Sequence, residues 1–98
     1  MIKYFKKRIF MRIIKIKEIV RKDFPIYYRR LYSSIIIIEM MGRPIEKKID
    51  FSIETKPTGQ KDILITILEP VDYPLIPLLK ELKKFINEID SNGQLPAL

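Results

Sequence analysis

The pattern of hydrophobic and polar positions predicts strands over most of the chain and a helix near its C-terminal end. Residues 45–55 show the clearest strand pattern, because Ile49, Phe51 and Ile53 fall on one side of an extended chain and polar residues lie between them. A two-residue period of this kind is typical of a strand with one buried face. We therefore predict a strand over residues 45–55.

A second alternating segment follows at residues 62–68, with three isoleucines on one side and Leu64 and Leu68 on the other. The five intervening residues, 56–60, contain a proline and a glycine, which turns favour. Two alternating segments separated by so short a loop predict an antiparallel hairpin. The two leucines indicate that this strand is covered on more than one face.

Two further strands are predicted before residue 45. Residues 27–41 include four successive isoleucines at 35–38, a run typical of a strand covered on both faces. Residues 12–20 fit a helical period as well as an alternating one. We favour a strand for 12–20 because isoleucine, which is β-branched and packs well in sheets, dominates there.

The C-terminal part of the chain has the spacing of an amphipathic helix. Apolar residues recur there at intervals of three and four over four turns, and lysines, Asn87 and Glu88 occupy the opposite side. The apolar stripe consists of Leu75, Leu78, Leu79, Leu82, Phe85, Ile86 and Ile89. These positions predict a helix that buries one face against the sheet.

Turn and capping residues mark the limits of these elements. Ser33-Ser34 indicates a bend or bulge inside the second strand, and residues 42–44 (Gly-Arg-Pro) predict a turn after it. Asp72 is the expected N-cap of the helix, with Pro74 in its first turn. Residues 91–93 (Ser-Asn-Gly) predict the end of the helix, with Gly93 or Asn92 in the left-handed conformation.

Together these elements predict an α+β fold. We expect a three- to four-stranded antiparallel meander, in the order ββββα, packed on one C-terminal α-helix, with an N-terminal segment that is a strand or a helix. A chain of 98 residues suits one domain. The expected organisation is a basic N-terminal extension at 1–11 that can be disordered, a domain at 12–93 and a tail at 94–98.

The composition excludes most catalytic chemistry. The chain has no cysteine and no histidine, so disulfides, thiolate nucleophiles, imidazole bases and the usual zinc ligands are absent. No serine lies in a glycine-rich elbow, and no loop has the glycines that cradle phosphate. We therefore expect a cytoplasmic protein that is not an enzyme, with no catalytic residues, no cofactor and no metal.

The positive charge is concentrated in the first third of the chain. Residues 1–30 hold 11 Lys and Arg against two acids, whereas the whole chain has a net charge of +7. Clustered bases interleaved with aromatic residues are typical of proteins that bind single-stranded nucleic acid. This predicts a nucleic-acid-binding surface made by Lys15, Lys17, Arg21, Lys22, Tyr28, Arg29, Arg30 and Tyr32.

The predicted order of elements resembles that within one repeat of PUR-type and Whirly-type single-strand-binding proteins, and the resemblance is one of topology alone. It implies a single-strand-binding role, which agrees with the charge pattern. No residue motif of those families occurs in this sequence.

Two other functions are compatible with the same sequence. One helix covers one face of a sheet, so the isoleucine run and Leu64 and Leu68 favour a homodimeric protein-protein interaction module in which a second chain supplies cover. Alternatively, residues 1–20 could attach to a membrane surface as a basic amphipathic helix. We consider a membrane role less favoured, because that segment is rich in β-branched isoleucine.

Overall fold

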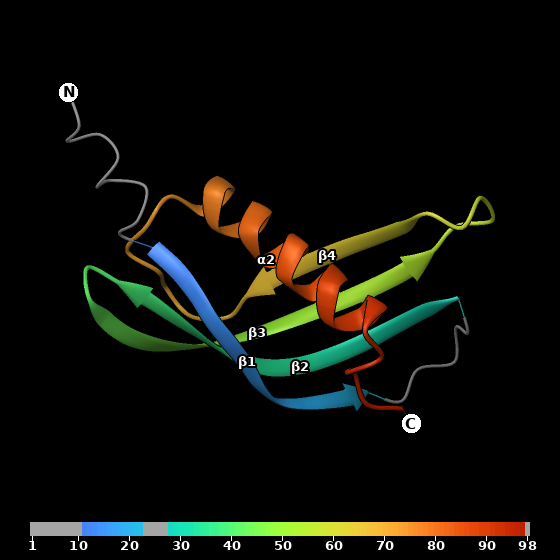
Figure 1. The fold of residues 1–98 in the computed structure, drawn as a ribbon, viewed down its shortest axis with the longest axis horizontal. Coiled ribbons are helices and arrows are strands. Elements are labelled where there is room, and N and C mark those ends of the chain that lie inside the picture. The colour runs from blue at the N-terminus through green and yellow to red at the C-terminus, as the bar shows by residue number, and fades with distance from the viewer. Residues whose placement is uncertain (1–10, 23–27, 98) are drawn as a thin grey trace.

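The computed structural model describes residues 11–22 and 28–97, and these form a four-stranded antiparallel sheet with one helix on it (Figure 1). Consecutive strands are neighbours, in the order β1-β2-β3-β4. The elements are β1 (Met11–Lys22), β2 (Arg29–Met40), β3 (Arg43–Thr55), β4 (Lys61–Ile67) and α2 (Leu75–Ser91). The predicted α+β fold and its ββββα order are confirmed.

The core lies between α2 and the face of the sheet toward it. The buried residues of β2, β3 and β4 alternate along each strand, as the two-residue period requires. On α2 the completely buried residues are Leu78, Leu82 and Ile86, four residues apart. The sheet side of the core consists of Met11, Tyr32, Ile36, Ile38, Met40, Ile49, Phe51, Ile53 and Ile65.

The β2–β3 connection is a two-residue hairpin turn made by Met41 and Gly42. Both have positive φ, 50° and 80°, as expected for the turn type that matches the twist of a hairpin. The turn is therefore shorter than predicted from residues 42–44, because Arg43 pairs with Met40 as the first residue of β3.

The irregular strand of the sheet is β1. Its pairing with β2 shifts between Ile13 and Lys15 and again between Lys17 and Val20, and Glu18 has a φ of 52° in the second interruption. The bend predicted at Ser33-Ser34 is wrong, because β2 pairs with β3 without any shift. Residues 12–20 do form a strand, and this strand begins at Met11, which is buried.

The helix begins later than its sequence signals indicate. Pro74 occupies the N-cap position and no side chain caps this end, so the prediction of Asp72 as the N-cap is wrong. At the other end Gly93 is left-handed, with a φ of 69°. The Gly93 N–H donates to the Asp90 carbonyl (3.0 Å) and the Gln94 N–H to the Ile89 carbonyl (2.9 Å), which is the pattern of a Schellman motif. Beyond it, Leu95 packs against the core.

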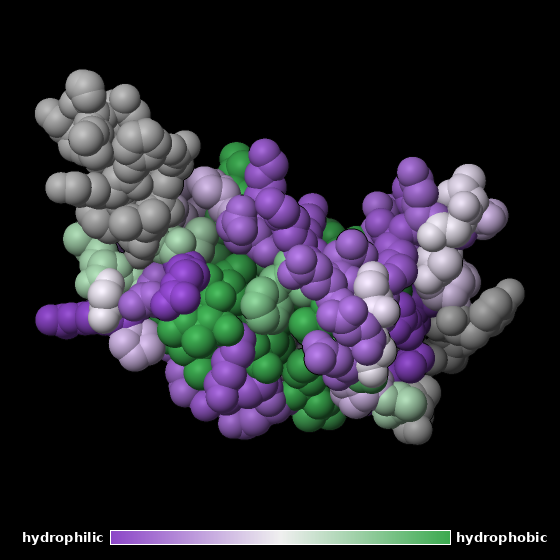
Figure 2. Space-filling view, viewed as in Figure 1, coloured by the Kyte–Doolittle hydropathy of each residue, from purple (hydrophilic) through white to green (hydrophobic). Residues whose placement is uncertain are grey.

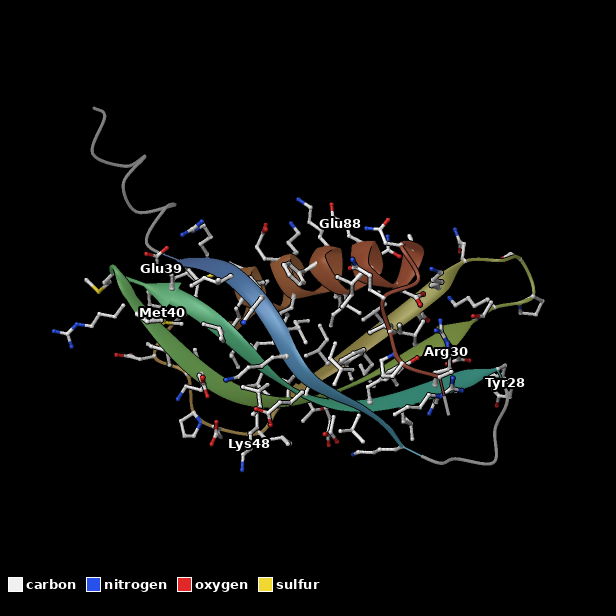
Figure 3. All side chains as sticks on the ribbon, turned by 60° about the horizontal axis from the view of Figure 1, so that its bottom comes forward. Tyr28, Arg30, Glu39, Met40, Lys48 and Glu88 are labelled. Carbon is white, nitrogen blue, oxygen red and sulfur yellow. The ribbon has the colours of Figure 1, made fainter. Side chains whose placement is uncertain are left out.

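The opposite face of the sheet is covered by long charged side chains. Lys17 and Lys22 of β1 reach across β2 to Glu46 (2.7 Å) and Asp50 (3.2 Å) of β3. In Figure 3, Lys48 points away from α2 on this face. Ile35, which lies opposite Lys17 in the register, is half-buried. The aliphatic stems of the lysines thus give the isoleucine run part of its cover.

Candidate interaction surface

The residues predicted to bind nucleic acid are divided between the two faces of the sheet. Arg21, Arg30 and Tyr32 belong to the helix side, because Arg21 lies opposite buried Tyr32 and side chains alternate along β2. The residues on the other face are Lys15, Lys17, Lys22 and Arg29, while Tyr28 precedes β2 and is 47% exposed. The eight side chains therefore do not form one continuous surface.

Most of the bases on the outer face are paired with acids. Besides the Lys17 and Lys22 pairs, Arg29 bonds to Glu54 across β2 and β3 (3.1 Å). The hydrogen bond from Lys17 to Glu46 raises the pKa of the Lys17 ammonium group. Lys15 is exposed and has no acid within ion-pair distance among residues 11–22 and 28–97. Much of the N-terminal positive charge is thus neutralised on the sheet itself.

On the helix side, Arg30 belongs to a cluster that joins three elements. Its guanidinium donates two hydrogen bonds to the Asp90 carboxylate of α2 (2.9 and 3.0 Å), and the Lys61 ammonium of β4 donates a third (2.7 Å). Figure 3 shows Arg30 at the end of the sheet where α2 ends. The hydrogen bonds from Arg30 hold the pKa of Asp90 below its ordinary value of 3.8, and the same contact raises the pKa of Arg30. This cluster stabilises the fold.

Tyr32 is part of the core. It is 1% exposed and stacks on Phe51, with ring centroids 4.9 Å apart and an interplanar angle of 19°. The Arg21 guanidinium carbon lies 5.9 Å from the centre of the same ring. A buried ring of this kind has no face to offer a nucleotide base, so Tyr32 is removed from the predicted binding set.

The exposed bases of α2 were not singled out as binding residues from sequence. Lys80 and Lys84 line a groove of about 630 Å³ between β1 and α2, and Lys83 and Lys84 line a second groove between α2 and β4. Figure 2 shows apolar surface in the middle of this side of the molecule, bordered by hydrophilic residues. Within the described chain, none of the three lysines has an acid within ion-pair distance.

The second feature without a partner is the outer edge of β4, the last strand in the sheet order. The Lys56 N–H donates to the Gln60 carbonyl (2.8 Å) and the Leu68 N–H to the Lys48 carbonyl (2.9 Å). Since hydrogen-bonded pairs alternate in an antiparallel ladder, residues 62, 64 and 66 turn their backbone groups toward β3. Residues 61, 63, 65 and 67 turn theirs toward the open edge, where no described segment pairs with them.

Apolar side chains gather beside this edge. Leu64 and Leu68 are 66% and 52% exposed on the outer face, and Leu75 and Ile76 at the start of α2 are 52% and 78% exposed. Ile67, Leu68 and Leu75 also line a shallow depression where the chain passes from β4 to the helix. The sequence signal for this surface was the pair of leucines on the second face of the strand.

The described part of the chain offers no arrangement for metal chemistry or membrane crossing. Among residues 11–22 and 28–97, no group of three or more acids is close enough to hold a metal ion. No helix in the same residues has the length and apolar character to cross a bilayer. The features that can act chemically are therefore charged and apolar surfaces.

The fold and these surfaces define a small α+β domain in which one helix covers one face of a four-stranded meander and one strand edge is open. The sequence profile of the BB-0187 family matches residues 8–91, and the chain belongs to this family. Neither the curated proteins nor the solved structures contain a match to the chain.

Proposed function

We propose that this chain is a non-enzymatic, cytoplasmic protein-protein interaction module that works as a homodimer. The observation that carries the proposal is the open edge of β4, which combines unpaired backbone groups with exposed leucines. Such an edge is a template for pairing with another strand. A cytoplasmic location agrees with the absence of cysteine.

The two edges of the sheet differ in a way that favours β4. The β1 edge has two register shifts and carries Lys15 and Lys17, and bulges and lysines are the usual protection against edge-to-edge association. β4 pairs with β3 without a shift, and the middle of the strand, residues 63–67, is uncharged. The unprotected edge is therefore the one suited to bind a second chain.

Sedimentation of the full chain over a range of concentrations tests the proposal. We expect a dimer, and we expect Leu64→Lys to shift it toward the monomer. Burial of a leucine contributes about 1.5–3 kcal/mol, so losing it in both copies raises the dimer dissociation constant by at least about tenfold. Val20→Lys is the matched control, because Val20 is 59% exposed on the other edge strand. A wild-type chain that stays monomeric at about 100 µM would refute the proposal.

Nucleic-acid binding is a second candidate, and the helix lysines favour it. Lys80, Lys83 and Lys84 lie within five residues of each other on α2 and line the grooves on both of its sides. Unpaired lysines are available to phosphate, whereas lysines held by carboxylates must first give up those contacts. This arrangement supports contact with the backbone of a nucleic acid through α2.

A titration with a single-stranded oligonucleotide at low salt distinguishes this candidate. If it is right, replacing the three helix lysines by glutamine weakens binding and reduces its salt dependence, because fewer counterions are released. Replacing Lys17 and Lys22, which are paired with acids, has a smaller effect. Absence of binding by the wild-type chain at low salt counts against the candidate.

A further inference from the structure

The open edge of β4 has a register in which it pairs with itself. Resting on the proposed homodimer, we propose that two copies join their β4 strands antiparallel about a two-fold axis at Leu64, which makes one continuous eight-stranded sheet. The residues whose backbone groups face the open edge are 61, 63, 65 and 67. An antiparallel pairing centred on Leu64 sets 61 against 67 and 63 against 65, so all four are hydrogen-bonded.

Other two-fold registers use this edge less well. A pairing centred on Asp62 would place that carboxylate against its own copy, and like charges directly opposite are destabilising. A pairing centred on Thr66 leaves 61 and 63 without partners. Pairings centred on Ile63 or Ile65 leave one of the four residues unpaired. The register centred on Leu64 is the one that uses all four and sets no charge against its like.

The side chains of the outer face agree with the same register. Leu64, with 66% of its surface exposed, meets Leu64 of the second copy at a non-hydrogen-bonded position, where the two Cα atoms of an antiparallel pair are about 4.5 Å apart. Asp62 lies opposite Thr66, which can donate a hydrogen bond to its carboxylate. The most exposed side chain of β4 thereby becomes the centre of an apolar contact.

Single cysteines test this register, because the chain contains no cysteine of its own. We expect Leu64→Cys to form a disulfide-linked dimer under mild oxidation with diamide. A disulfide requires Cα atoms within about 7 Å. Thr66→Cys is the control on the same face of the strand, since its two copies would be four residues apart along the paired strands, about 13 Å. A mixture of Asp62→Cys and Thr66→Cys chains should cross-link to each other, because those positions are opposite.

The outcomes separate this inference from the homodimer itself. Cross-linking of Leu64→Cys at least about tenfold faster than Thr66→Cys supports the register, given the distance limit of a disulfide. Equal rates, faster linking of Thr66→Cys or no linking in a chain that sediments as a dimer would overturn the register and leave the homodimer standing. A chain that sediments as a monomer would overturn both. Circular dichroism of each reduced variant establishes that it is folded.

Discussion

The carboxylate of Asp90 is the contact whose loss should cost the fold most per atom changed. Its side chain is 8% exposed and accepts hydrogen bonds from Arg30 of β2 and Lys61 of β4, so it ties the end of α2 to two strands. Replacement by asparagine keeps the shape but removes the charge. Arg30 and Lys61 then lose their counter-charge at a site where both are only 25–30% exposed.

The size of the effect follows from these exposures. Hydrogen bonds to charged groups contribute about 1.5–3 kcal/mol each, but cations that retain part of their hydration recover some of this. We therefore expect Asp90→Asn to lower the free energy of unfolding by about 2 kcal/mol in total. For a domain of this size the midpoint of thermal unfolding would fall by about 10 °C.

Urea unfolding followed by circular dichroism, with all variants at one protein concentration, measures this difference. Glu46→Gln is the matched control, because it removes the same charge from an exposed pair with Lys17. Exposed pairs of this kind contribute little to stability, because water screens the attraction and both side chains lose freedom when they pair. If Asp90→Asn and Glu46→Gln destabilise the chain equally, the assignment of Asp90 as a structural tie is refuted.

Three further predictions concern stability. Because the folded-state pKa of Asp90 lies below its ordinary value of 3.8, its stabilisation is complete above that value and is lost as the pH falls through the folded pKa; the difference between wild type and Asp90→Asn should thus shrink in acid unfolding titrations. Ser34 is 4% exposed and its hydroxyl has no partner within the described residues, so Ser34→Ala should raise the urea midpoint by the equivalent of about 1 kcal/mol; a lower midpoint would show that the hydroxyl is bonded. Met41→Asn places the favoured Asn-Gly pair in the β2–β3 turn and should stabilise by about 0.5 kcal/mol, measured by thermal unfolding; no gain would argue against this turn type.

The fold could be predicted because each element has its own periodicity. The alternation around Phe51 and the helical stripe around Leu82 are local patterns, and each correctly places its residue in the core. The binding surface could not be predicted in the same way. Whether a lysine is paired depends on the register between strands, and the two shifts in β1 determine which β3 acids Lys17 and Lys22 meet. Charge counting along the chain cannot detect that neutralisation.

The role of Tyr32 illustrates the same limit. Its aromatic and basic neighbours favoured an exposed stacking surface, but alternation places it on the face that also holds Ile36 and Ile38, where it packs on Phe51. By contrast, the leucines on the second face of β4 were visible in the sequence, and the structure leaves them exposed beside an open edge. The strand edge itself becomes evident only when the sheet order is known.

Amide hydrogen exchange of the wild-type chain, resolved by residue, tests the pairing of β4 most directly. The amides of 62, 64 and 66 face β3 and should exchange slowly in a monomer and in a dimer alike. The amides of Ile63, Ile65 and Ile67 face the open edge, and we predict that they become equally protected as the protein concentration rises. Fast exchange at these three positions at every concentration, beside slow exchange at 62, 64 and 66, would contradict self-association through β4.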